Sequence, residues 1–267
     1  MKFTKMHGSG HDYILMNCMD SFPDDPAGLS EKLSNRHFGV GGDGLICICP
    51  SEKADFYMRM FNADGSEGAM CGNGIRCAAK YVFEKRLTNK ECISFETPAG
   101  VRVTELHTKH GEIHAVSVDM GKASTGEVMD IDVKGKYYTG VGVQVGNPHF
   151  VIPVPDVEMV NVQGIGASLQ RCDIFPGGIN VEFVKVLCKG EIKVRVWERG
   201  SGETMACGTG ACAAAAVMSA MGRTDRQVTV HMQGGDLAVT CRESDQHLIL
   251  QGPAETVFEG SVCGTLW

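Results

Sequence analysis

Short stretches rich in valine, isoleucine and aromatic residues recur along most of the chain, with glycine, proline or aspartate between them. This pattern predicts short β-strands joined by tight turns. The expected strands are Lys2–Lys5, Leu45–Cys49, Asp55–Met60, Ile93–Glu96, Val101–Glu105, His114–Val118, Val141–Val145, Asn180–Val186, Ile192–Trp197, Val228–Met232, Leu237–Cys241 and Leu248–Gln251.

Two segments instead have the apolar pattern of helices, and they start near Gly72 and Gly208. The second, T-G-A-C-A-A-A-A-V-M-S-A-M-G, is apolar on almost every side, which is typical of a fully buried helix. Gly222 is expected to end it. Shorter surface helices are expected at Leu29–Arg36 and Gly166–Arg171. Together these elements predict an α+β fold in which a mostly antiparallel sheet surrounds a buried central helix.

The chain contains an internal repeat. The stretch Arg59–Gly74 is similar to Arg195–Gly210, at a constant offset of half the chain length and without a gap. The matched pairs include Arg59 with Arg195, Phe61 with Trp197, Glu67 with Glu203, Cys71 with Cys207, His11 with Asn147 and Gly44 with Asn180. The repeat predicts two pseudo-symmetric domains with a site in the cleft between them.

The expected domain limits follow from this repeat. Residues 1–118 with 253–267 form the N-terminal domain, which the C-terminal strand closes, and residues 119–252 form the C-terminal domain. The segment near Gly121–Gly135 is expected to connect the two halves.

Composition narrows the classes of function. The net charge of −7 argues against a nucleic-acid or anionic-membrane surface. The N-terminus lacks the apolar region of a signal peptide, and no apolar run is long enough for a transmembrane helix. The 12 cysteines include no C-x-x-C spacing, so neither a zinc ribbon nor a thioredoxin motif is expected. These features predict a cytoplasmic protein with reduced thiols.

Cys71 and Cys207 each precede a glycine-flanked helix start. The free N–H groups there lower the pKa of a thiol and can also bind a carboxylate. Two such thiols on opposite faces of an α-amino acid could remove the α-proton from one face and deliver a proton to the other. The N–H groups would stabilise the developing negative charge, so no electron-sink cofactor is needed. We therefore expect no cofactor and an amino acid as substrate.

Several motifs resemble the diaminopimelate epimerase family. They are K-M-H-G-S-G-H-D-Y, N-A-D-G-S-E-G-A-M-C-G-N-G-I-R-C, G-N-P-H-F-V, N-V-E-F-V and E-R-G-S-G-E-T-M-A-C-G-T-G-A-C, in the family order. The resemblance implies two similar domains and a cofactor-independent interconversion of LL- and meso-diaminopimelate, in lysine and peptidoglycan-precursor synthesis. It also implies a homodimer.

The resemblance assigns roles residue by residue. It implies that Cys71 and Cys207 are the acid/base pair. The positions that would hold the reacting carboxylate are Gly72, Asn73, Gly208 and Thr209. Those that would hold the distal end of the substrate are Asn62, Asn147, Asn180 and Arg199. Glu198 would lie near an amino group of the ligand, His149 near the site, and Gly44 is a supporting position.

One position departs from the family. The family usually has asparagine in G-x-G-N-D-F, where this chain has His11, the repeat counterpart of Asn147. A histidine can still donate and accept a hydrogen bond, but it is bulkier and can change charge near neutral pH. His11 is therefore kept among the substrate-binding residues, with altered substrate preference as an alternative.

Three further motifs in the sequence suggest other functions. The letters G-x-G-x-x-G occur at residues 39–44, but a β-like segment follows them where a dinucleotide site needs a helix. The two H-x-x-x-H spacings, from His7 and from His110, span glycines, so no metal site is expected. A racemase of another amino acid, such as histidine, and a thiol-rich redox or metal-binding module stay open as alternatives. The expected partner is a small amino acid, with no nucleic acid or membrane.

Overall fold

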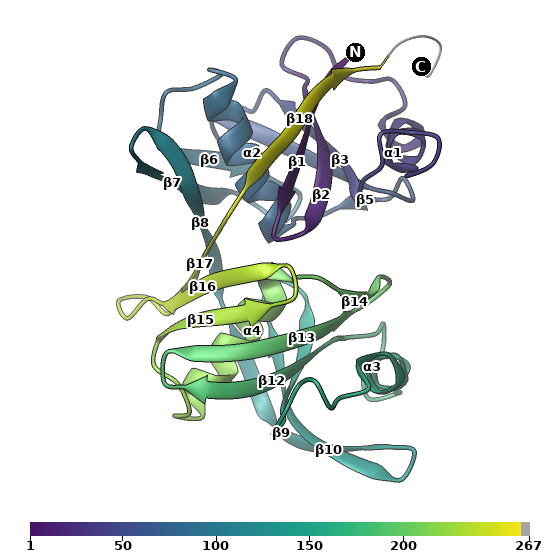
Figure 1. Cartoon of the computed structure of the whole chain (residues 1–267), viewed down its shortest axis with the longest axis vertical. Coiled ribbons are helices and arrows are strands. Elements are labelled where there is room, and N and C mark those ends of the chain that lie inside the picture. Colours follow the sequence, from purple (N-terminus) through teal and green to yellow (C-terminus); the bar gives the residue numbers. More distant parts are fainter. Residues whose placement is uncertain (263–267) are drawn as a thin grey trace. The chain divides into compact units, whose positions relative to one another are not determined.

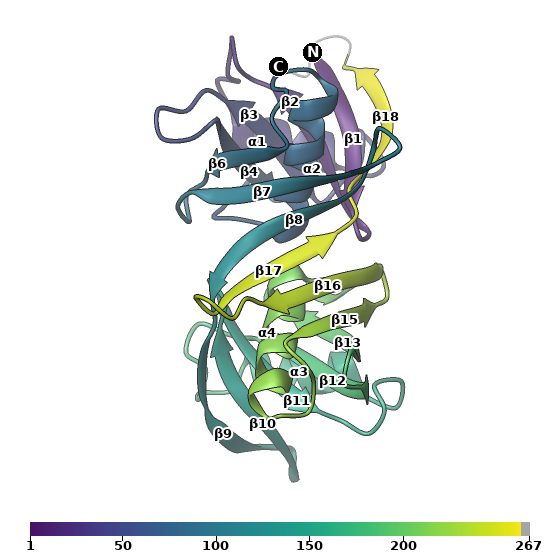
Figure 2. The same ribbon diagram turned by 90° about the vertical axis from the view of Figure 1, so that its left-hand side faces the viewer.

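The computed structural model describes residues 1–262. Residues 263–267, the end of the predicted N-terminal domain, lie outside the described residues, and so does Cys263. The chain forms two compact units (Figures 1 and 2). Unit 1 holds Met1–Val118 and the described residues from Gly252 to Val262, and unit 2 holds Asp119–Gln251. Gly252, which we expected in the second domain, therefore belongs to unit 1.

Unit 1 contains a mostly antiparallel sheet with the strand order β18-β1-β2-β3-β4-β6-β7-β8. Only the β2–β3 and β4–β6 pairs of this order are parallel. The elements are β1 (Lys2–Gly8), β2 (His11–Asn17), α1 (Pro26–Ser34), β3 (Gly44–Cys49), β4 (Phe56–Asn62), β5 (Glu67–Gly68), α2 (Gly72–Glu84), β6 (Cys92–Glu96), β7 (Arg102–Lys109), β8 (Glu112–Lys122, which continues into unit 2) and β18 (Glu255–Ser261).

Unit 2 repeats this topology with the order β9-β10-β11-β12-β13-β15-β16-β17 and two parallel pairs, β11–β12 and β13–β15. The elements are β9 (Ser124–Val133), β10 (Lys136–Gln144), β11 (Pro148–Pro153), α3 (Val162–Gln170), β12 (Asn180–Cys188), β13 (Glu191–Glu198), β14 (Gly202–Thr204), α4 (Gly208–Ala220), β15 (Gln227–Met232), β16 (Gly235–Cys241) and β17 (His247–Gly252). The bounds of α3 and α4 follow those of α1 and α2 at the offset of the sequence repeat, so the repeat is also structural.

The central helices account for the fold class. In α2 every residue from Gly72 to Val82 is buried, and the helix contacts β1, β2, β3, β4 and β7. In α4 the run of alanines allows β10, β11, β12, β13, β15 and β16 to pack around it. The predicted α+β class, with a buried helix inside a mostly antiparallel sheet, is confirmed (Figure 2).

Three local expectations need correction. The stretch 121–135 is mostly strand β9 paired with β10, because alternation in E-V-M-D-I-D-V places Ile131, 2% exposed, in the core. The short helices α1 and α3 begin earlier than expected. Asp25 and Asn161 cap them by accepting hydrogen bonds from the backbone N–H groups of Gly28 and Gly164, both at 2.9 Å.

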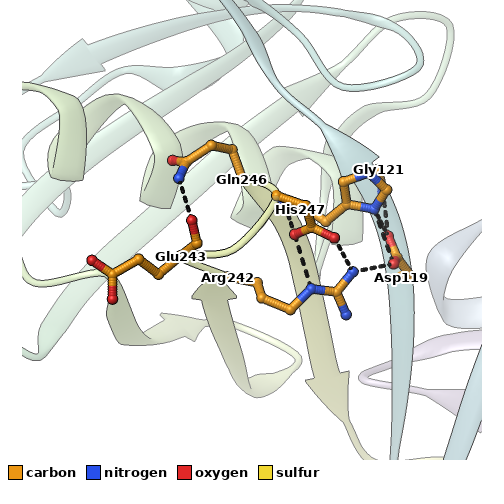
Figure 3. Close-up of polar contacts among 7 residues, drawn as sticks. Asp119, Gly121, Arg242, Glu243, Gln246 and His247 are labelled. Atoms are coloured by element: carbon orange, nitrogen blue, oxygen red, sulfur yellow. Dashed lines mark hydrogen bonds and ion pairs between the residues drawn. The ribbon is translucent and has the colours of Figure 1, made fainter.

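The chain enters unit 2 at Asp119, where a polar cluster holds β8 (Figure 3). The carboxylate of Asp119 accepts hydrogen bonds from the Gly121 N–H at 2.9 Å and from Arg242 Nη2 at 3.0 Å. It also contacts Nδ1 of His247 at 2.8 Å. These contacts fasten the first residues of unit 2 to the β16–β17 hairpin.

Candidate functional site

Cys71 is the N-cap residue of α2. Its backbone is extended, with φ −134° and ψ 124°, and its Sγ accepts a hydrogen bond from the Gly74 N–H at 3.4 Å. Gly72 and Asn73 follow as the first residues of the helix, and both are buried. The thiol therefore lies at the positive end of the helix dipole, among N–H groups that no helical carbonyl accepts.

Two side chains from β2 reach this thiol. Tyr13 Oη lies 3.0 Å from Cys71 Sγ, and His11 also hydrogen-bonds the thiol. Burial by itself would raise the pKa of Cys71, but the His11 hydrogen bond and charge, with Tyr13 and the Gly74 N–H, outweigh burial and lower the pKa. Burial and the neighbouring Cys71 raise the pKa of Tyr13 well above its ordinary value, so this phenol stays neutral and can donate.

A chain of hydrogen bonds orients the His11 ring. Arg76 Nη2 donates to Asn73 Oδ1 at 2.9 Å, which turns the Asn73 amide nitrogen toward His11 Nδ1 at 3.0 Å. Nδ1 is then the acceptor, so the proton of a neutral ring is on Nε2. His11, predicted to bind substrate, therefore presents its ring to the thiol as a hydrogen-bond donor.

Cys207 occupies the same position at the start of α4, and it is 4% exposed. Its Sγ accepts a hydrogen bond from the Gly210 N–H at 3.4 Å and lies 3.4 Å from Thr209 Oγ1. Burial raises the pKa of this thiol well above its ordinary value, and the negative charges of Glu198 and Glu182 add to the effect. The hydrogen bonds from Thr209 and Gly210 do not compensate for it.

A buried carboxyl group lies beneath Cys207. Glu182 of β12 is 0% exposed, and its Oε1 lies 2.6 Å from His149 Nδ1. His149 Nε2 in turn donates to Asn147 Oδ1 at 2.9 Å. Within residues 1–262, Glu182 Oε2 has no hydrogen-bond partner. Burial raises the pKa of Glu182 despite the contact with His149.

The predicted distal-end residues lie in both units. In unit 2, Asn180 Oδ1 accepts from the Arg199 N–H at 2.8 Å, and the exposed Arg199 side chain donates to the Gly177 carbonyl at 3.0 Å. Glu198 Oε1 accepts from Thr204 at 2.5 Å. In unit 1, Asn62 Nδ2 donates to Ser66 Oγ at 2.9 Å.

Gly44 has a structural reason to be glycine. A Cβ there would lie 2.3 Å from the Phe61 carbonyl oxygen, because β3 pairs closely with β4. Gly44 lies directly opposite Asn62 in this ladder. Its role is therefore to allow the strand pairing that places Asn62 at the end of β4.

Sequence reasoning missed two residues that touch this chemistry, Tyr13 and Glu182. A signal was present for both. Tyr13 lies two residues after His11, so the two side chains share one face of a strand, and the repeat pairs Tyr13 with His149. Glu182 is an acid inside the apolar run N-V-E-F-V, where an unpaired charge would be costly.

The competing motifs do not have the structural setting of a dinucleotide or metal site, although His11 of one of them contacts Cys71. Residues 39–43 lie in the connection between α1 and β3, and Gly44 begins β3, so no helix follows the glycines. Among residues 1–262, no three His, Cys, Asp or Glu side chains are grouped as a metal would require. In that same part of the chain, no helix is both long and apolar enough to cross a membrane.

Comparison with known proteins identifies the family. The sequence model of diaminopimelate epimerase matches residues 3–126 and 141–257. The chain belongs to the diaminopimelate epimerase family. It is 46% identical to the diaminopimelate epimerase of Acetivibrio thermocellus, over 98% of each chain. It is 47% identical to that of Phocaeicola vulgatus, again over 98% of each.

Solved structures of other proteins share the fold. A probable proline racemase from Agrobacterium radiobacter superposes with a TM-score of 0.77 at 14% identity, covering 98% of this chain and 92% of that one. A hydroxyproline epimerase from Agrobacterium vitis gives a TM-score of 0.74 at 15% identity, covering 97% and 91%. At these identities the likeness concerns the fold alone.

Proposed function

We propose that this protein is an isomerase that interconverts LL- and meso-diaminopimelate, in the synthesis of lysine and of peptidoglycan precursors. The observation that carries the proposal is the matched pair of thiols, each the N-cap of a buried helix that begins with glycine. Family membership, with relatives of that name 46% and 47% identical over nearly the whole chain, supports it.

In the proposed mechanism Cys71 and Cys207 act on opposite faces of one α-carbon. A thiolate takes the α-proton, the C–H bond breaks, and its electron pair is delocalised into the substrate carboxylate. The other thiol then gives its proton to the opposite face of the same carbon, so one proton leaves and one arrives. After the step the charge has moved from one sulfur to the other, and the reverse reaction runs through the same groups.

The starts of α2 and α4 supply the stabilisation that this carbanion needs. Backbone N–H groups at the helix starts, those of Gly72, Asn73, Gly208 and Thr209, can donate to the reacting carboxylate, where the negative charge develops. Because these donors are fixed by the helices, little reorganisation accompanies the reaction. The glycines allow the backbone to approach the ligand without a Cβ in the way.

The distal end of diaminopimelate carries a second amino group and carboxylate. We assign its carboxylate to Arg199 and its polar contacts to Asn62, Asn147 and Asn180, with Glu198 facing an amino group. A substrate without this second end would make none of these contacts, which favours diaminopimelate over a monoamino acid. We also propose a cytoplasmic homodimer, as the family resemblance implies, and light scattering of the purified protein in solution tests the dimer.

Deuterium incorporation at the α-carbon tests the function. In heavy water a two-base mechanism places deuterium first in the product isomer, and both Cys71→Ser and Cys207→Ser lose nearly all epimerisation. Cys92→Ser, at an exposed position on β6, is the matched control and keeps full activity. Preference for a monoamino acid such as histidine over diaminopimelate would overturn the substrate assignment. Full activity of Cys71→Ser, or stoichiometric metal in the purified protein, would overturn the mechanism.

A further inference from the structure

The internal repeat allows the two thiols to be compared position by position. In the alignment of the two halves, His11 corresponds to Asn147, Tyr13 to His149 and Ile46 to Glu182. The helix starts themselves are equivalent, since both thiols accept an N–H at 3.4 Å from the third helical residue. The two thiols therefore differ in these three pairs of side chains, and also in Asn62 against Glu198 and Asn73 against Thr209.

Around Cys71 the repeat positions carry hydrogen-bond donors and an apolar group. His11 and Tyr13 both hydrogen-bond the sulfur. Ile46 lies beneath the helix, where a Cβ on Gly74 would be 3.0 Å from Ile46 Cδ1. The other ionisable groups that face this region are Arg76 and Cys77 of α2, with Asp43 acting on Tyr13. A negative charge on Cys71 Sγ is thus met by donors.

Around Cys207 the equivalent side chains hydrogen-bond one another. Asn147 and His149 bond to each other, and His149 bonds Glu182. Glu182 Oε1 lies so close to the helix start that a Cβ on Gly210 would be 2.8 Å from it. Glu198 of β13 also acts on the thiol. A negative charge on Cys207 Sγ is thus met by carboxyl groups.

We propose that the two thiols are not equivalent in the substrate-free protein: Cys71 is the resting thiolate, Cys207 is the resting thiol, and His11 and Tyr13 are positioning residues that hold Cys71 in its ionised form. The inference rests on the epimerase function proposed above. It means that the free enzyme is ready for the isomer whose α-proton faces Cys71. The other isomer requires the proton to move between the two sulfurs first.

The asymmetry predicts which thiol controls each limb of the pH profile of kcat/KM. Turnover needs one proton shared by two sulfurs, so activity is lost at acid pH when Cys71 is protonated and at alkaline pH when Cys207 ionises. Loss of a donor to Cys71 moves the acid limb toward higher pH and leaves the alkaline limb in place.

Alkylation of the full-length protein by iodoacetamide tests the inference without substrate. Rates are followed as a function of pH, and peptide mass spectrometry separates Cys71 from Cys207. Because only the thiolate reacts, the pH midpoint for each peptide reports its own ionisation, whatever its exposure. We expect the Cys71 midpoint below that of a free cysteine and the Cys207 midpoint above it.

The variants Tyr13→Phe and His11→Leu are expected to raise the Cys71 midpoint by about one pH unit each, a tenfold slower reaction at a pH below the midpoint. His11→Asn, which restores one donor, is expected to lie between His11→Leu and the wild type. None of these three variants is expected to move the Cys207 midpoint. Tyr137→Phe, at an exposed tyrosine of β10, is the matched control and moves neither.

Two results would overturn the inference. One is ionisation of Cys207 before Cys71, and the other is an unchanged Cys71 midpoint in both Tyr13→Phe and His11→Leu. Tyr13→Phe removes a single oxygen atom, so we expect this variant to fold normally. Thiolate absorbance in a Cys207→Ser background gives a second measure of the Cys71 midpoint. Absence of diaminopimelate turnover would count against the function alone, because the alkylation midpoints require no substrate.

Discussion

Replacing Gly210 by alanine tests how tightly Glu182 is held beneath Cys207. A Cβ at Gly210 would lie 2.8 Å from Glu182 Oε1 and 3.3 Å from Cys207 Cβ. An ordinary contact starts near 3.4 Å, so the carboxylate oxygen has to retreat by about 0.6 Å. This oxygen is 2.6 Å from His149 Nδ1 in a fully buried position, so the carboxyl group can turn aside only by giving up that contact.

The magnitude follows from two opposing terms. Overpacking of a core costs about 1–3 kcal/mol, and replacing glycine by alanine in a helix returns at most about 1 kcal/mol. Subtracting the gain leaves a net loss of up to about 2 kcal/mol, which lowers Tm by up to about 8 °C in a chain of this size. Activity should fall as well, because the displaced carboxyl group and the thiol share the helix start.

Gly74→Ala is the matched control on the other repeat. Its Cβ would lie 3.0 Å from Ile46 Cδ1, the free end of an aliphatic side chain, which can give way by a few tenths of an ångström. We expect a stability within about 0.5 kcal/mol of wild type. Urea unfolding and thermal scans compare the two variants. Equal stabilities for Gly74→Ala and Gly210→Ala would refute the idea that Glu182 is rigidly held.

The other predictions concern stability. Arg76→Met should lower the free energy of unfolding, measured in urea, by about 2–4 kcal/mol. The reason is that the fully buried Arg76 donates hydrogen bonds to Gly72, Asn73, Ser9 and Pro253. A decrease below about 1 kcal/mol would contradict this. Asp25→Ala should lower the stability by about 1 kcal/mol in thermal unfolding and leave activity unchanged, since it removes only the cap of α1. Asp119→Asn should destabilise at pH 7. Burial opposes ionisation there, but the Gly121 N–H, His247 and Arg242 outweigh it and lower the pKa of Asp119 from 3.8. The stabilisation is present above the unfolded pKa and is lost as the pH falls below it, so the variant and wild type should converge in acid unfolding.

Local patterns predicted much of the fold and part of the site. The constant offset between the two halves aligns α1 with α3 and α2 with α4, so the duplication was visible in the letters alone. The position of the two cysteines just before the helix starts was also predictable from the sequence, because a helix cap depends on a few consecutive residues. Strand β2, H-D-Y-I-L-M-N, was missed because its polar start follows the turn-like G-S-G; its pairing with β1 and β3 makes it a strand.

By itself the sequence determined the α+β class, the internal repeat, and a thiol at the start of a glycine-flanked helix in each half. Only the tertiary structure decided how the two thiols differ. Tyr13 reaches Cys71 across 58 residues of chain, and Glu182 lies beneath Cys207 because β12 packs against α4. Such contacts depend on strand register and side-chain orientation, which the periodicity of one segment does not contain. The repeat made the thiols look alike, but His11 and Tyr13 hydrogen-bond Cys71, whereas the carboxyl groups of Glu182 and Glu198 act on Cys207.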